Sequence, residues 1–226
     1  MRRVIRVVSS VLIIAGGLLL IDAALTVAWQ EPVSAVYGHI NQNKLDGQLK
    51  KIEAAPLPVV EQKALKALPD PSRKIAFLAR SQKRHAKDGE AVGKIQIPRI
   101  GANFVVVNGT DAADLRKGPG IYPQTPFPGA GGTTAIAGHR TTYAAPFRKV
   151  NELKKGNRVI VTMPYGRFTY TVERLQIVPP TALWVINRVR YDRLVLSACH
   201  PLYSAAKRLI VFARLPDVQP RGKARA

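Results

Sequence analysis

Seven short runs of β-forming residues between residues 91 and 217 place the strongest constraint on the fold of this chain. The runs are rich in Val, Ile, Thr and aromatic residues, and glycine or proline lies between many of them. They are GKIQIP, ANFVVV, TTAIAG, RVIVTM, RFTYTVERLQIV, LVLSA and RLIVFARL. Many short strands with turn signals between them predict one all-β domain, a sandwich or a small barrel. One short helix is expected between strands, over Ala145–Leu153.

The regions on either side of this domain differ in character. Residues 31–90 mix charged residues with alanine and proline and lack a sustained apolar stripe, so we expect a stalk or linker with helical segments. The alternative is an N-terminal helical part of the domain, because KIAFLARSQKRH has the pattern of a short helix that docks. Residues 218–226 lack a core-forming pattern and are predicted to be a basic, disordered tail.

The N-terminus carries an apolar run, Val7–Trp29, that is long enough to cross a bilayer at about 20 residues per span. Three basic residues precede it: Arg2, Arg3 and Arg6. By the positive-inside tendency, residues 1–30 predict a cytoplasmic basic flank and a single-pass transmembrane signal anchor, with the rest of the chain extracytoplasmic.

Two features of the run bear on this interpretation. Asp22 interrupts it, and a carboxylate costs roughly 2.5–3.5 kcal/mol at a helix centre, although less near the outer end. The triplet Thr26-Val27-Ala28 has the small-x-small form of a signal-peptidase site, so a cleaved secretory signal stays an alternative. The domain is extracytoplasmic in either case.

The charge of the chain is strongly positive, with 35 Lys and Arg against 14 Asp and Glu and a formal net charge of +21. Residues 91–217 alone hold 18 basic and 6 acidic residues. Such an excess favours an anionic partner. Because the domain is expected outside the cytoplasm, an anionic membrane or cell-wall polymer fits better than nucleic acid.

Cys199 is the single cysteine in 226 residues and follows the apolar run LVLSA. One thiol cannot close an intramolecular disulfide, so Cys199 is a buried apolar residue, half of an intermolecular bridge, a metal ligand or a nucleophile. A cysteine nucleophile needs a neighbour that accepts its proton or stabilises the thiolate.

Four histidines are candidates for that neighbour. His39 and His85 lie in the region before the strands, where a solvated surface position is expected. His200 is adjacent to Cys199, and neighbouring side chains of a strand point to opposite faces. His139 ends the run TTAIAG as Cys199 ends LVLSA, so two strands that end at the same rim would bring them together.

Arg208 begins the next apolar run, and a short turn through HPLYSAAK can return it beside the thiol. A guanidinium there could donate hydrogen bonds to an oxyanion or to the substrate backbone, while the structural alternative is a solvated strand end. A closed zinc site is disfavoured, because the chain has neither a Cys-x-x-Cys nor a His-x-x-x-His spacing.

Taken together and in order, these segments resemble the sortases, the cysteine transpeptidases of Gram-positive-type cell envelopes. GKIQIPRIGANFVVVNGT is similar to the opening strands of the family, and IAGHRTTYAAPF and CHP are most similar to class E. The resemblance implies a closed eight-stranded β-barrel with short helices, in which Cys199 is the nucleophile, His139 the family histidine and Arg208 the family arginine.

The resemblance further implies partners and chemistry. The substrates would be secreted proteins with C-terminal sorting signals of the Leu-Ala-x-Thr-Gly or Leu-Pro-x-Thr-Gly type, cleaved between Thr and Gly. The acceptor would be an amine of a peptidoglycan precursor, or a pilin lysine. No cofactor is expected: some family members bind calcium, but this sequence shows no acidic cluster for it.

The sequence departs from the family pattern just before the nucleophile. Ser197 and Ala198 stand where a Thr-x-Thr or Thr-Thr pair is usual, so both are candidate substrate contacts. The segment Val178–Arg193 is short for class E and takes the place of the substrate-recognition loop. Within it Thr181 and Val185 are expected to line the peptide pocket.

Two rival functions stay open on sequence grounds. An L,D-transpeptidase also uses cysteine and histidine, but its cysteine usually follows glycine and an arginine comes soon after. A degenerate sortase-like barrel could bind wall polymer through its basic surface and perform no catalysis.

Overall fold

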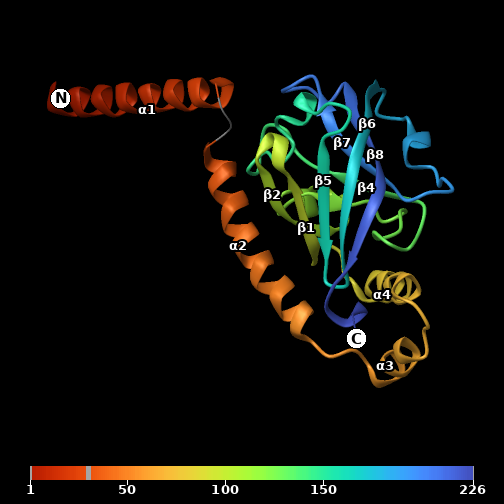
Figure 1. Cartoon of the computed structure of the whole chain (residues 1–226). Coiled ribbons are helices and arrows are strands. Elements are labelled where there is room, and N and C mark those ends of the chain that lie inside the picture. The colour runs from red at the N-terminus through yellow and green to blue at the C-terminus, as the bar shows by residue number, and fades with distance from the viewer. Residues whose placement is uncertain (1, 29–31, 226) are drawn as a thin grey trace.

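The strands close into an eight-stranded barrel in the order β1-β2-β3-β4-β7-β8-β6-β5, with β5 paired to β1 (Figure 1). The computed structural model describes residues 2–28 and 32–225. The strands are β1 (Ala91–Ile97), β2 (Ala102–Asn108), β3 (Gly120–Ile121), β4 (Thr133–Ala137), β5 (Arg158–Met163), β6 (Gly166–Val178), β7 (Arg193–His200) and β8 (Lys207–Pro220). The predicted all-β class and closed barrel are confirmed.

Two strand pairs of the barrel are parallel, β2 with β3 and β4 with β7, and the other pairs are antiparallel. Between β4 and β7 the partners run from Thr133 opposite Arg193 to Ala137 opposite Ser197. Because these strands run in the same direction, the segments that follow them leave the barrel at the same end.

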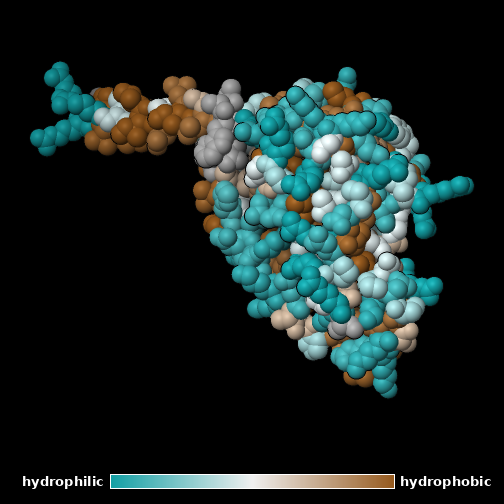
Figure 2. Space-filling view, viewed as in Figure 1, coloured by the Kyte–Doolittle hydropathy of each residue, from teal (hydrophilic) through white to brown (hydrophobic). Residues whose placement is uncertain are grey.

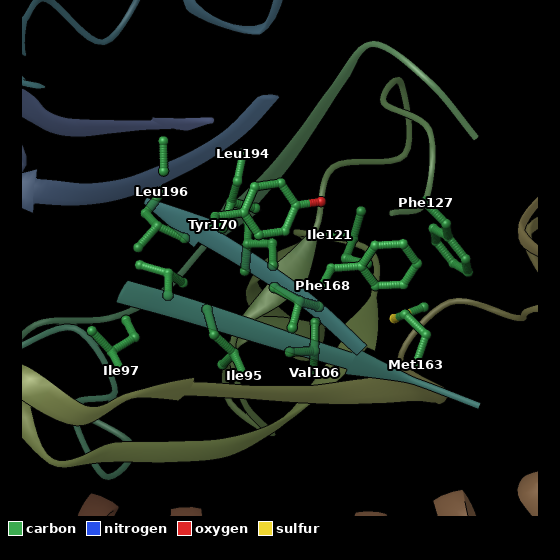
Figure 3. Packing of buried hydrophobic residues seen from close by; sticks show 14 of the residues in the cluster. Ile95, Ile97, Val106, Ile121, Phe127, Met163, Phe168, Tyr170, Leu194 and Leu196 are labelled. Carbon is green, nitrogen blue, oxygen red and sulfur yellow. The ribbon is translucent and has the colours of Figure 1, made fainter. Parts of the chain in front are cut away.

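Side chains fill the barrel interior, as Figure 3 shows for ten labelled residues. Along β7, Leu194, Leu196 and Ala198 point into this core, and Val195 points to the outer wall. Each fully buried large aliphatic or aromatic side chain contributes about 1.5–3 kcal/mol. A packed interior leaves the outer wall and the rims as the places for reactive groups.

Two helices pack on the barrel, α2 (Pro32–Ala54) and α4 (Pro71–His85), and the short helix α3 (Val59–Lys66) lies between them in the chain and away from the strands (Figure 1). In α2, Leu45 and Leu49 are buried against the outer faces of β1 and β2. In α4, Ile75 and Leu78 join the main core cluster. The stalk expected for residues 31–90 is therefore not what the structure shows, and the alternative of a helical part of the domain describes it.

The described part of the C-terminus is ordered as well. β8 continues to Pro220, which pairs with Gly166 of β6, and a 3₁₀ turn, η4, covers Gly222–Ala224. The predicted disordered tail is thus wrong for residues 218–225. Backbone pairing with β6 satisfies polar groups here, although the side chains carry no apolar pattern.

The remaining elements are short. The helix expected over Ala145–Leu153 is only a 3₁₀ turn, η2 (Val150–Glu152). The others are η1 (Pro98–Ile100), α5 (Ala112–Leu115) and η3 (Leu183–Ile186). These turns connect barrel strands and cover little of the core.

The N-terminal helix α1 (Arg2–Ala28) is long and apolar enough to cross a membrane over Arg2–Leu25. Figure 2 shows apolar side chains along this helix, whereas most of the visible barrel surface is hydrophilic. Trp29, the predicted end of the span, lies outside the described residues. This helix is a candidate membrane anchor.

Candidate active site

The ends of β4 and β7 bring His139 and Cys199 level with each other. Ala137 is the partner of Ser197, and the Gly138 amide donates to the Ser197 carbonyl at 3.1 Å. His139 and Cys199 each lie two residues beyond this pair. Cys199 shares a face of β7 with Ser197, whereas His139 follows the end of β4, and both side chains line one cavity.

Arg208 is the direct cross-strand partner of Cys199 in the antiparallel pair of β7 and β8. The neighbours of Arg208, Leu209 and Val211, lie in the barrel core, whereas Ile210 lies in the apolar cluster on the outer wall. Alternation therefore places Arg208 on the outer wall with Cys199. The structure brings the three predicted catalytic residues together.

A cavity of about 340 Å³ opens beside the thiol. It is lined by His139, Arg140, Thr141, Cys199, Pro201, Tyr203, Ser204 and Ala205. The Arg208 guanidinium is turned toward the β7–β8 connection, where its Nη1 donates to the carbonyls of Ala205 and Lys207 at 2.9 and 3.0 Å. Cys199 is half-buried, so a peptide carbonyl entering this cavity can reach the sulfur.

His139 is half-buried, and its Nε2 is enclosed without a hydrogen-bond partner among the described residues. Burial lowers the pKa of His139, and the positive charge of Arg116 lowers it further. The ring of Tyr143 covers the imidazole, with 5.2 Å between ring centroids. The neutral imidazole is therefore favoured in the resting protein.

The backbone that follows His139 is held in an unusual conformation. Tyr143, Ala144 and Ala145 have φ angles of 54°, 61° and 42°, which for non-glycine residues cost of order 1–3 kcal/mol each. Such residues persist only where their surroundings fix them. Here α2 does so: the Tyr143 amide donates to Ser34 Oγ at 3.0 Å, and Tyr37 packs edge-on against the Tyr143 ring.

Two further residues hold His139 in place. A side chain at Gly138 would put its Cβ 2.6 Å from the ring of Phe147, which is fully buried, so only glycine fits this approach. Arg140 is 5% exposed and donates to the carbonyl of Cys199 at 3.2 Å. Neither Arg140 nor Tyr143 was predicted from the sequence to belong to the site, although both stand in the IAGHRTTYAAPF segment.

The structure places the four predicted substrate contacts in different surroundings. Val185 is buried in the outer-wall apolar cluster, and Ser197 is buried on the face of the strand that carries Cys199. Thr181 is exposed on the β6–β7 connection and is not part of the cavity lining. Ala198 packs into the barrel core on the opposite face from the thiol, so its side chain does not fit the predicted substrate contact.

Arg193 fastens the β6–β7 connection to the barrel. Its side chain is 9% exposed and donates to the carbonyls of Val185 and Asn187 and to Thr133 Oγ1, at 3.0, 2.8 and 3.2 Å. Within residues 2–28 and 32–225, no group of three or more His, Cys, Asp or Glu is placed to hold a metal ion. The described residues of the site place a thiol, an imidazole and a guanidinium on one wall.

A β-barrel with a thiol, an imidazole and a guanidinium on one wall is the arrangement of a cysteine enzyme. Comparison with known proteins identifies the class. Residues 95–216, more than half of the chain, match the Sortase domain family. Sortase D of Bacillus subtilis (strain 168) is 35% identical over 130 residues, covering 56% of this chain and 64% of that protein. The chain therefore belongs to the sortase family.

The solved structures agree with this membership. Sortase E of Streptomyces avermitilis matches with a TM-score of 0.55 and 34% identity, over 59% of this chain and 93% of that structure. Sortase SrtE1 of Streptomyces coelicolor is 26% identical over 153 residues, 60% of this chain and 43% of that protein. The chain thus aligns with less than two thirds of these curated relatives, and similar identities to sortases D and E support the family rather than one class.

Proposed function

We propose that the protein is a membrane-anchored cysteine transpeptidase of the class E or class D type, which cleaves a C-terminal sorting signal and transfers the acyl group to an amine. One observation carries the proposal: the parallel register of β4 and β7 sets His139 and Cys199 level on the outer wall, with Arg208 opposite Cys199. A merely structural cysteine needs neither neighbour.

In the first step the Cys199 sulfur attacks the carbonyl carbon of the threonine in the signal. A neutral His139 accepts the thiol proton as the C–S bond forms and gives it to the nitrogen of the departing glycine as the C–N bond breaks. The lowered pKa of His139 fits this neutral starting pair better than a standing thiolate–imidazolium pair.

In the second step an amine attacks the thioester. His139 takes a proton from the amine as the new amide bond forms, and it returns that proton to the Cys199 sulfur as the C–S bond breaks. Arg208 supports both steps by stabilising the oxyanion or by aligning the peptide backbone, since a guanidinium donates several hydrogen bonds at fixed angles.

The proposed partners are those that the family resemblance implies, and the candidate anchor and the charge suit them. The α1 helix would hold the domain at the extracytoplasmic face of the membrane, where secreted proteins with Leu-Ala-x-Thr-Gly or Leu-Pro-x-Thr-Gly signals emerge. The acceptor is proposed to be an amine of a peptidoglycan precursor. A net charge of +21 suits an anionic envelope surface and its polymers.

The test incubates the full chain, in detergent, with peptides of both signal types, with and without a glycine-led amine, and follows products by mass spectrometry. Cleavage after threonine, amine-dependent ligation and loss of both in Cys199→Ala are expected. A folded protein that cleaves neither peptide and whose Cys199 does not react with iodoacetamide at neutral pH would overturn the proposal in favour of a wall-binding protein. Ligation to lysine peptides alone would instead indicate a pilin-polymerising enzyme.

A further inference from the structure

Arg140 is a buried arginine that joins three separate parts of the active-site wall. Its Nη1 donates to the carbonyl of Cys199 at 3.2 Å. Nε and Nη2 donate to the carbonyl of Arg148 at 3.3 and 3.2 Å, and Nη2 also donates to Oδ1 of Asn151 at 2.6 Å. One guanidinium thus links the nucleophile's own backbone to the segment that follows the histidine.

Burying the charged side chain of Arg140 costs free energy. Burial and the nearby charge of Arg148 lower the pKa of Arg140, and the described structure gives Arg140 no acidic side chain in an ion pair. A buried charge without an opposite charge is costly unless hydrogen bonds satisfy it, and the Arg140 guanidinium donates four. The hydrogen bonds of the guanidinium must therefore supply something that an apolar residue cannot.

The guanidinium can supply a fixed geometry between the backbone segments that it joins. The planar guanidinium donates at fixed angles, so one side chain fixes the separation of the carbonyls of Cys199 and Arg148. His139 precedes Arg140 directly, and both residues line the cavity beside the thiol. A guanidinium that holds the Cys199 carbonyl thus sets where the sulfur lies relative to the imidazole.

We propose that Arg140 is a positioning residue, which fixes the Cys199 thiol against His139 by holding the backbone carbonyl of the nucleophile. The inference rests on the proposed transpeptidase function. The charge adds to the effect, because a Cys199 thiolate and the Arg140 cation attract each other. Arg140 is not expected to touch the substrate carbonyl, which is the role assigned to Arg208.

The test compares Arg140→Lys and Arg140→Met with the matched control Arg193→Lys. Arg193 is also buried and donates to two carbonyls and a hydroxyl, but it lies six residues before Cys199 on β7, about 20 Å away at 3.3 Å per residue. Far-UV circular dichroism first confirms that each full-length variant is folded. Asn151→Ala provides a milder variant, because Asn151 is exposed and accepts one of the four hydrogen bonds.

Two readouts separate positioning from general stability. The first is kcat and KM for the sorting peptide, where both Arg140 variants should lower kcat about 10- to 100-fold with little change in KM. The second is the pH dependence of Cys199 alkylation by iodoacetamide, which needs no transpeptidation. Arg140→Met should move this profile to higher pH, Arg140→Lys less so, and Arg193→Lys not at all.

Each outcome decides the proposal. A lowered kcat with a shifted alkylation profile in the Arg140 variants, and a weaker effect of the same kind in Asn151→Ala, supports it. Equal losses in Arg140→Lys and Arg193→Lys with unshifted profiles overturn it and leave a structural role. A wild-type protein whose Cys199 reacts but that neither cleaves nor ligates the sorting peptides separates the two proposals, because the alkylation profiles would still test Arg140.

Discussion

The segment after β4, residues 138–149, and the segment between β6 and β7, residues 179–192, both adjoin the wall that carries Cys199, yet they are held differently along their length. We call them the histidine loop and the β6–β7 loop. The histidine loop is fixed by directional contacts: the hydrogen bonds of Arg140, the Ser34 hydroxyl and three residues with positive φ. The β6–β7 loop is tied by Arg193 at Val185 and Asn187, and it otherwise rests on apolar side chains that include Val195 and Phe212.

The difference matches what each loop must do. Hydrogen bonds are directional and fix one geometry, whereas apolar contact is not directional and tolerates small shifts. The β6–β7 loop also leaves Leu183 72% exposed and Trp184 47% exposed, which suits a surface that meets a peptide. We infer that the histidine loop sets the rate of the reaction and the β6–β7 loop sets the affinity for the substrate.

The largest effect should come from removing the imidazole of the histidine loop. His139→Gln is expected to lower kcat/KM for the sorting peptide by about 10²–10⁴, the usual contribution of a general acid–base residue. His200→Gln is the matched control, because His200 is adjacent to Cys199 but alternates to the other face of β7. Peptide kinetics with equal losses in the two variants would contradict the assignment of His139.

The support that α2 gives to the histidine loop can be broken at Gly38. A Cβ there would lie 2.7 Å from the Tyr143 carbonyl carbon and 2.9 Å from the Ala144 nitrogen, both backbone atoms that cannot easily move. Gly38→Ala should destabilise the fold by about 1–3 kcal/mol, as overpacking does, and raise hydrogen exchange in residues 142–145. Thermal unfolding and hydrogen exchange measure the two effects.

Gly47→Ala is the matched control in the same helix, since a Cβ at Gly47 meets nothing within 4 Å. It should stabilise the protein by up to about 1 kcal/mol through helix propensity. If Gly38→Ala leaves the stability of the protein and the hydrogen exchange of residues 142–145 unchanged, α2 does not support the histidine loop.

The β6–β7 loop is tested by Trp184→Ala. The indole stacks on Phe212 with 6.2 Å between centroids, and an aromatic pair contributes about 0.5–1.5 kcal/mol. We expect KM for the sorting peptide to rise about 2- to 10-fold while kcat stays near the wild-type value. Trp184→Phe keeps the stack and should behave like the wild type. A fall in kcat without a change in KM would argue against the division of roles between the loops.

The smallest effect concerns pH. Arg116 is one of two causes that lower the pKa of His139, and burial, the larger cause, remains when Arg116 is replaced. Arg116→Gln should therefore raise the pKa of His139, so that the loss of kcat/KM on acidification begins at higher pH. Arg158→Gln, at an exposed position of β5, should leave the pH profile in place. A shift of the kcat/KM profile toward lower pH in Arg116→Gln would be opposite to the expected change and would refute the neutral-imidazole mechanism.

Much of the fold was predictable because its signals are local. Short β-forming runs predicted every strand of the barrel except β3, and an apolar run predicted α1. The helices over residues 32–85 and the pairing of residues 218–220 were not predicted as part of the domain. Their side chains look solvated in sequence, and burial on one narrow face, or backbone pairing alone, holds them in place.

The sequence by itself singled out the candidate reactive groups, because Cys199 is unique, His139 and Arg208 stand at the edges of apolar runs, and all three match the family motifs. Tertiary structure alone decided their neighbours. Arg140 follows His139 in sequence, but its partners lie on β7 and around η2, and the partner of Tyr143 lies on α2, over 100 residues away in the chain. Strand alternation also turned Ala198 inward and Cys199 outward. Local patterns specify elements, whereas register and packing between distant elements decide which side chains meet.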